Sequence, residues 1–187
     1  YHGDVIGPAV GGVIGDDGIV GIKIGKDNPI GEAHIEFQNY LKKLKELGIV
    51  LTVASKNDEE NAIEGLEYNN MLLHKNDFLV IKANWNPKPN NILESADEIN
   101  IGIDSFVFLD DNPVERELVK NQLQGVAVPN IDNKVENYQD IVDRNNYFEF
   151  LSVSEEDLQR LKYYEDNQSR EKEKLNYENY QEYLKSL

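Results

Sequence analysis

The sequence predicts an α/β fold, a doubly wound parallel sheet with helices on both faces. Short apolar runs of strand length occur at residues 49–54, 78–81, 105–109 and 126–128, and polar segments follow them. The run SFVFL at 105–109 has no polar alternation, which is typical of a strand buried on both faces. Strands that alternate with helical segments in this way favour parallel pairing.

The segments between these runs carry helix signals. From Glu32 the apolar positions recur at helical spacing, and Gly48 is a natural C-terminal stop. A second helix is expected through Leu66, and a third begins near Lys88, where the following proline suits a first turn. A fourth is expected over residues 114–123.

Two further segments flank this core. Residues 11–25 contain two short β-branched runs around Asp16-Asp17-Gly18, a pattern that predicts a small β-hairpin flap. After residue 150 the composition becomes strongly charged with a thin apolar stripe, which indicates one or two long helices. We therefore expect a domain over residues 1–150 and a C-terminal helical extension over residues 151–187.

Composition excludes several classes of function. The 187 residues suit one domain, and 35 acidic against 19 basic residues give a formal charge of −16. This charge disfavours general binding to nucleic acid or to an anionic membrane. Cysteine is absent, so disulfides, thiolate metal sites and acyl transfer through an enzyme thiol are excluded. The sequence has neither a run of about 20 apolar residues nor a signal-peptide pattern, so we expect a cytoplasmic protein.

Polar residues directly after the predicted strands are the candidate site, because ligands of open parallel sheets bind beyond the carboxyl ends of the strands. These residues, with one near the start of the chain, are Asp4, Ser55, Lys56, Asn57, Lys88, Asp110 and Asp111. A hydroxyl, an ammonium and adjacent carboxylates suit a phosphoryl group beside Mg²⁺, since carboxylates bind a hard cation while Ser and Lys bind phosphate oxygens.

Each of these residues alone has an ordinary structural explanation. Ser55 is a good helix cap, Lys88 is one lysine among many, and the acids begin a favourable strand-to-helix turn. Two adjacent acids after an apolar strand nevertheless repel each other unless a cation or hydrogen-bond donors compensate, which favours a metal and phosphate role. The three histidines show no ligand spacing, and Trp85 is interpreted as a core or loop anchor.

Several ordered motifs identify a family resemblance. SKNDEENA from Ser55, IKANWNPKPNNI from Ile81, IDSFVFLDDNPVERE from Ile103 and GGVIGDDG from Gly11 together resemble the FkbH-like domain of the haloacid dehalogenase (HAD) superfamily. The resemblance covers nearly the whole chain. It implies a Rossmann-like phosphatase or phosphotransferase core that uses Mg²⁺.

The resemblance also implies residue roles and partners. It makes Asp4 the nucleophile, Ser55 the phosphate-binding hydroxyl and Lys88 the charge-neutralising lysine, with Asp4, Asp110 and Asp111 on the metal. The neighbouring Lys56, Asn57 and Asn84 are expected to bind the substrate, a small phosphorylated metabolite. Members in polyketide assembly dephosphorylate 1,3-bisphosphoglycerate and pass the glyceryl group to an acyl carrier protein, and others accompany surface-polysaccharide or lipid genes. An acyl carrier protein or an adjacent transferase domain is therefore an expected partner.

The sequence departs from the family pattern in two places. The opening motif Asp-x-Asp becomes Asp4-Val5-Ile6, so the second aspartate is missing, and only three residues precede Asp4 where a central strand is expected. Either that strand and motif lie outside this chain, or the chain is a degenerate copy with impaired turnover. In addition, Ala54 stands where glyceryl-transferring members place Cys.

Two functions of different classes follow from these observations. The first is an Mg²⁺-dependent HAD-type enzyme that acts on a small phosphorylated metabolite. The alternative is a catalytically degenerate binding or docking module of a multidomain biosynthetic protein. A phosphoacceptor receiver is disfavoured, because receivers place the acidic pair early and the lysine last, whereas Lys88 precedes Asp110 here.

Overall fold

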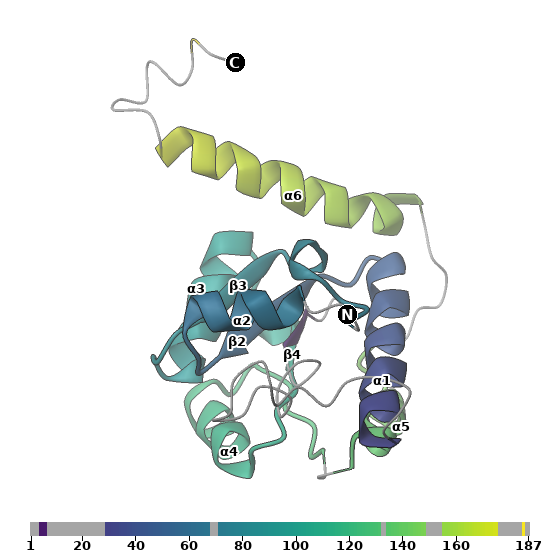
Figure 1. Ribbon diagram of the computed structural model, residues 1–187. Coiled ribbons are helices and arrows are strands. Elements are labelled where there is room, and N and C mark those ends of the chain that lie inside the picture. Colours follow the sequence, from purple (N-terminus) through teal and green to yellow (C-terminus); the bar gives the residue numbers. More distant parts are fainter. Residues whose placement is uncertain are drawn as a thin grey trace.

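A four-stranded parallel sheet forms the centre of the molecule (Figure 1). The computed structural model describes residues 4–6, 29–67, 71–131, 134–148, 155–175 and 185. The strands are β1 (Asp4–Ile6), β2 (Leu51–Ser55), β3 (Val80–Ala83) and β4 (Phe106–Phe108), in the order β3-β2-β1-β4. The expected α/β fold with a parallel sheet is confirmed, whereas the predicted hairpin at 11–25 lies outside the described residues.

Six α-helices occur in the described part of the chain. They are α1 (Pro29–Glu46), α2 (Glu59–Leu66), α3 (Lys88–Ile99), α4 (Pro113–Gln122), α5 (Tyr138–Arg144) and α6 (Glu155–Leu175). Helix α1 begins three residues before its expected start, because Pro29 fits a first turn, where its missing N–H has no intrahelical partner to lose. Helix α4 also begins at a proline, and Asn112 caps it by accepting from the Val114 N–H at 2.9 Å.

The predicted strand at 126–128 is wrong in extent. Only Ala127 pairs, in an isolated parallel bridge with Val107, through hydrogen bonds of 2.8 and 2.9 Å to the backbone of β4. Pro129 follows and has no N–H to continue a ladder, which explains why the pairing stops.

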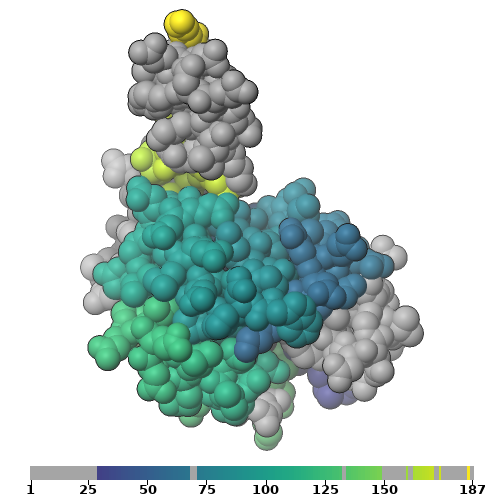
Figure 2. Space-filling model, turned by 90° about the vertical axis from the view of Figure 1, so that its left-hand side faces the viewer, coloured from purple at the N-terminus to yellow at the C-terminus, as the bar shows by residue number. Residues whose placement is uncertain are grey.

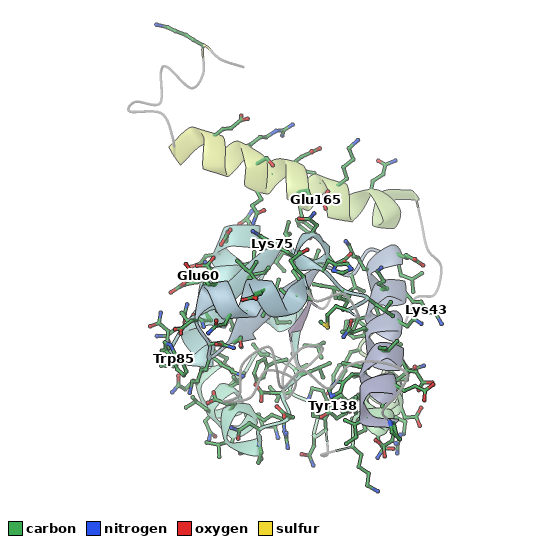
Figure 3. All side chains as sticks on the ribbon, in the orientation of Figure 1. Lys43, Glu60, Lys75, Trp85, Tyr138 and Glu165 are labelled. Atoms are coloured by element: carbon green, nitrogen blue, oxygen red, sulfur yellow. The ribbon has the colours of Figure 1, made fainter. Side chains whose placement is uncertain are left out.

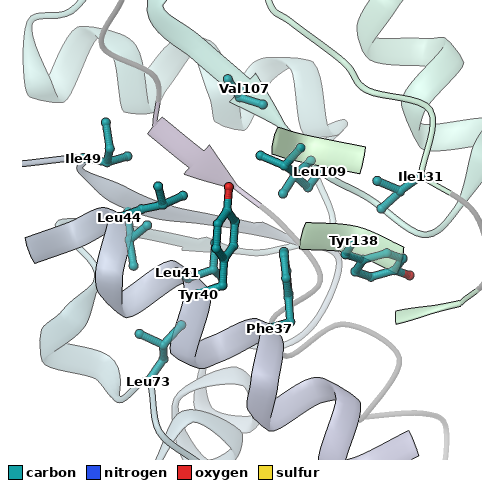
Figure 4. Close-up of a cluster of buried hydrophobic side chains, with 12 residues drawn as sticks. Phe37, Tyr40, Leu41, Leu44, Ile49, Leu73, Val107, Leu109, Ile131 and Tyr138 are labelled. Atoms are coloured by element: carbon teal, nitrogen blue, oxygen red, sulfur yellow. The ribbon is translucent and has the colours of Figure 1, made fainter. Parts of the chain in front are cut away.

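One face of the sheet packs against α1 and α5 (Figure 4). Phe37, Leu41 and Leu44 of α1 meet Val107 and Leu109, and Phe37 packs edge-on against Tyr138 of α5 with ring centroids 5.4 Å apart. All of these side chains are buried. This cluster fixes α1 along the sheet, with its first turn at the carboxyl end of the strands, because the helix runs antiparallel to β2, which follows it.

The opposite face packs against α3 and α4. Phe106 and Phe108 of β4 contact a cluster that includes Ile92 of α3 and Val119 of α4, all fully buried. Side chains along β4 therefore alternate strictly between the two faces, since Val107 belongs to the α1 cluster. Helices on both faces bury the sheet, as the unbroken apolar run predicted.

Helix α6 lies across the amino end of the sheet (Figure 1), and Figure 2 shows its yellow-green atoms against the teal part of the molecule. Gln168 donates to the Leu79 carbonyl at 3.1 Å and to Glu98 at 2.9 Å, and Tyr164 packs beside Val50 and Val80. The structure thus confirms a C-terminal helix, and the division at residue 150 stays a prediction. Among the described helices, none combines the length and apolar composition needed to cross a membrane.

Candidate functional site

Three segments meet at the carboxyl end of the sheet. Ser55 is the last residue of β2 and pairs with Ala83, and the Asn84 N–H donates to the Ser55 carbonyl at 3.0 Å. Lys88 begins α3, and Asp110 and Asp111 follow β4. The predicted convergence of Ser55, Lys88 and the acidic pair on one edge is therefore what the structure shows.

The central contact is an ion pair between Lys88 and Asp110. Lys88 Nζ donates to Asp110 Oδ2, and the side chains are only 14% and 5% exposed. The ammonium also lies 6.0 Å from the centre of the Phe108 ring. A lysine at the first position of α3 can make this contact because α3 crosses back over the sheet toward α4.

Backbone donors and Arg116 hold Asp110 in its turn. Asp110 Oδ1 accepts from the Asn112 N–H at 2.9 Å, and Arg116 Nη1 donates to the carbonyls of Asp110 and Asp111 at 2.7 and 3.0 Å. Burial raises the pKa of Asp110 above its ordinary value, although Lys88 and the Asn112 N–H favour its ionised form. The site therefore holds a desolvated carboxylate whose charge depends on its lysine.

The two acids differ in environment. Asp110 is buried and lies with Phe108 on the α3 side, whereas Asp111 is exposed and interacts electrostatically with His34 of α1. Burial lowers the pKa of His34, while the charge of Asp111 opposes this effect. His34 shows no metal-ligand spacing in the sequence, and a lone histidine does not reveal that it will be buried beside the acidic pair.

Lys56, predicted to bind substrate, is engaged with a residue that the sequence analysis missed. Its Nζ lies 2.6 Å from Oε1 of Glu115, which is in the first turn of α4 and only 8% exposed. A carboxylate in a first turn is favoured by the helix dipole, and this was the available signal for Glu115. Lys56 thus ties the loop after β2 to α4.

The two predicted substrate-binding asparagines have local structural partners. Asn57 Oδ1 accepts from the N–H of Asp58 at 2.8 Å. Asn84 Oδ1 accepts from the Asn86 N–H and from Asn91 Nδ2, at 3.0 and 2.9 Å. Both residues lie at the carboxyl end of the sheet, and their role toward a substrate stays a prediction.

The register of β1 bears on Asp4, whose expected roles as nucleophile and metal ligand stay predictions. Asp4 is the first residue of β1 and pairs with Phe106, while Ile6 pairs with Phe108. Asp110 lies four residues beyond Phe106, which at about 3.3 Å per residue is on the order of 13 Å along the strand direction. The register therefore separates the backbone of Asp4 from the edge that holds Asp110, because β1 begins at Asp4 instead of ending before it.

The described residues contain no cluster of three or more His, Asp or Glu side chains arranged to hold a metal ion. Asp110 and Asp111 are the adjacent carboxylates available at the edge. A cavity of about 370 Å³ occurs elsewhere, between α6 and the segment before β3, where Lys75 and Glu165 line it. This cavity lies at the amino end of the sheet and is not part of the candidate site.

Comparison with known proteins places this geometry beside a phosphatase domain. No family model matches the chain, and no curated protein matches it. A crystal structure of the N-terminal part of the protein BF1531 from Bacteroides fragilis, which contains a phosphatase domain complexed with Mg, is 42% identical with a TM-score of 0.74. The match covers 79% of this chain and 40% of that one, so the chain spans less than half the length of the protein it resembles.

Proposed function

We propose that this chain is an Mg²⁺-dependent phosphatase or phosphotransferase of the HAD type that acts on a small phosphorylated metabolite. The observation that carries the proposal is the buried ion pair between Lys88 and Asp110, on the same carboxyl edge of the parallel sheet as Ser55. The 42% identity to a phosphatase domain complexed with Mg supports the same class of reaction.

Lys88 and Ser55 are the groups that would bind the phosphoryl oxygens. Asp110 holds the ammonium of Lys88 at the edge of the sheet, so little reorganisation is needed when an anionic ester arrives. The Ser55 hydroxyl, at the end of β2, is a neutral donor for a second phosphoryl oxygen. Positive charge and donors placed in advance stabilise the charge that spreads over these oxygens during phosphoryl transfer.

The acidic pair fits Mg²⁺ by the chemistry of its donors. Mg²⁺ prefers oxygen ligands and commonly uses one or two carboxylates, with water and substrate phosphate completing its shell. Asp111 is exposed and can offer its carboxylate oxygens to the ion. Asp110 is buried, with Oδ2 accepting from Lys88 and Oδ1 from the Asn112 N–H, so it can contribute only through the remaining lone pairs of these oxygens. When bound, the ion would neutralise phosphate charge at this edge.

A more specific version of the proposed function, group transfer to a protein acceptor, follows the resemblance to FkbH-like domains. In that version the acceptor is an acyl carrier protein or an adjacent transferase domain of a biosynthetic assembly. Because the chain has no cysteine, such a transfer would proceed directly from substrate to acceptor without an enzyme thioester.

A phosphate-release assay tests the proposal. The chain should release phosphate from a panel of small phosphate monoesters only with Mg²⁺, and EDTA should abolish the release. The Asp110→Asn variant should lose at least 100-fold in kcat/KM, in the range typical of a lost charge-stabilising group (about 10²–10³). Asp77→Asn, which removes a carboxylate paired with Lys45 away from the site, is the matched control. Activity that survives EDTA, or equal losses in both variants, would refute the proposal.

A second function, a non-catalytic docking module, is favoured by one observation. The register of β1 places Asp4 away from Asp110, and Ile6 occupies the position of the second motif aspartate. Such a module would retain an anion-binding edge without turnover. Capture of a carrier protein or neighbouring domain, with no hydrolysis of any ester in the panel, would establish it.

A further inference from the structure

Trp85 is a large aromatic side chain that the structure leaves exposed. It is the only tryptophan of the chain, and 70% of its surface is accessible. Its indole N–H donates to Asp58 Oδ1 at 2.9 Å. The hydrogen bond fixes the ring in one orientation, so the exposed apolar surface has already lost much of its conformational freedom and is ready to bind.

The ring stands between the two loops that carry the candidate site. Trp85 follows Asn84, whose N–H is bound to the Ser55 carbonyl, and it precedes Lys88 by three residues. Its hydrogen-bond partner Asp58 lies three residues after Ser55. The indole is thus tied to both the phosphate-binding hydroxyl and the lysine by short stretches of chain.

We propose that Trp85 is the contact surface for the part of the substrate that is not phosphoryl, and that this part is uncharged with an apolar or aromatic face. The inference rests on the proposed phosphatase or phosphotransferase function in its general form, and it departs from the FkbH-like version, whose family substrate 1,3-bisphosphoglycerate carries two phosphates. It adds a substrate class, namely phosphate monoesters of apolar or aromatic alcohols.

The charges around the Trp85 ring disfavour a substrate that carries a second anionic group. The residues next to its anchor are acidic, Asp58 followed by Glu59 and Glu60, and Figure 3 shows Glu60 and Trp85 on the same side of the molecule. The nearby lysines are already engaged, Lys56 with Glu115 and Lys88 with Asp110. Within the described part of this edge, a second phosphate over the indole would meet carboxylates with no unpaired lysine to compensate.

Other exposed apolar residues follow the same edge. Among the described residues, five large hydrophobic side chains are strongly exposed, and three of them, Ile30, Trp85 and Val114, lie at or just before the first turns of α1, α3 and α4. These first turns are the helix ends at the carboxyl edge of the sheet. Exposed apolar side chains on the same edge as the Lys88–Asp110 ion pair suit an ester with one charged end and one apolar end.

Binding can be measured without turnover, because emission from the single tryptophan reports on this position alone. With Mg²⁺ present, benzylphosphonate should shift the emission to the blue and reduce its quenching by acrylamide. Methylphosphonate and fructose 1,6-bisphosphate should do neither. Equal effects of benzylphosphonate and methylphosphonate, or no effect of either, would overturn the inference.

Kinetics provide the second readout. Trp85→Ala should lower the ratio of kcat/KM for 2-naphthyl phosphate to that for glycerol phosphate by roughly three- to tenfold, through KM, as expected for a lost aromatic contact. Tyr163→Ala, which removes a 63% exposed aromatic from α6, should leave the ratio unchanged. Equal losses on both esters would overturn the inference. Absence of any phosphate release would refute the proposed function instead, and the fluorescence titration would still decide the role of Trp85.

Discussion

Lys88, the first residue of α3, forms a buried ion pair with Asp110, which follows β4 at the far side of the sheet. The contact joins two crossover connections at the edge where ligands of parallel sheets bind. Because Asp110 is almost fully buried, its ionised form depends on Lys88. The same ion pair therefore contributes to the stability of the fold and to the proposed function.

Removing Lys88 should destabilise the fold and abolish activity together. Lys88→Ala leaves the Asp110 carboxylate buried without its partner, and loss of one member of a buried pair costs about 3–5 kcal/mol. Lys45→Ala breaks the pair with Asp77, whose side chains are 19% and 18% exposed, and should cost about 1 kcal/mol. Urea unfolding of both variants, with phosphate release measured in parallel, checks this prediction.

The pH dependence of the Lys88→Ala variant provides a control on this explanation. Without the lysine, burial should raise the pKa of Asp110 further, so the folded protein retains a proton that the unfolded chain releases above about pH 4. The stability deficit should therefore shrink as the pH falls toward 4. A deficit independent of pH would attribute the loss to packing against Phe108 instead.

Lys56 should contribute to stability through Glu115. Lys56→Ala leaves a carboxylate that is 8% exposed without its 2.6 Å partner, and an unsatisfied buried group costs about 1–3 kcal/mol. Lys120→Ala removes an exposed i,i+3 partner of Glu117 on the same helix and should cost less than about 0.5 kcal/mol. Equal changes in the free energy of unfolding would show that Glu115 does not depend on Lys56.

Much of the fold follows from the sequence because apolar runs and helix stops are local signals. The strands near residues 51, 80 and 106 and the helices between them lie close to where the sequence predicts them. Two boundaries differ from the prediction because of prolines. Pro29 moves the start of α1 earlier, and Pro129 limits the pairing near residue 127 to Ala127. Helix α5 has seven residues and carries no comparable signal, and its place is set by Tyr138 packing on α1.

The site was predicted in part. Ser55, Lys88, Asp110 and Asp111 could be found because residues after parallel strands share one edge, whichever side chains they carry. The burial of Glu115 beside Lys56 depends on how α4 packs, which no single sequence position reveals.

Two other features of the site depend on tertiary information, which local patterns do not carry. Trp85 is not a core residue, although its bond to Asp58 does anchor the loop. The register of β1 against Phe106, which displaces Asp4, also depends on tertiary pairing and not on local pattern.

Asp77 should stabilise the protein at neutral pH and lose this contribution in acid. Partial burial alone would raise its pKa, but the His74 N–H at 2.9 Å and the ammonium of Lys45 hold the pKa below its ordinary value of 3.8. A lowered pKa in the folded state means that the contribution is present above about pH 4 and disappears as the pH falls through the folded-state value. Asp77→Asn should therefore cost about 1 kcal/mol at pH 7 and converge with the parent chain once the pH falls below the folded-state pKa of Asp77. Thermal unfolding of both proteins across this range checks the sign, and a gap that widens in acid would contradict it.

Gln168 should hold α6 on the amino end of the sheet. Its amide donates both to the Leu79 carbonyl and to Glu98, and Tyr164 adds an apolar contact one turn earlier. Gln168→Ala removes both hydrogen bonds, each worth about 1 kcal/mol, so α6 should open more often while the sheet stays intact.

Hydrogen exchange resolved by peptide is the measurement for α6. Protection over residues 155–175 should fall by roughly 5- to 30-fold in Gln168→Ala, and protection of β2 and β4 should not change. Ser169→Ala is the matched control, because the hydrogen bond of the Ser169 hydroxyl to a described residue goes to the Glu165 carbonyl of its own helix, at 2.9 Å. If both variants exchanged alike, Gln168 would not be what docks α6, and the contact of Tyr164 with Val50 and Val80 would have to hold the helix alone.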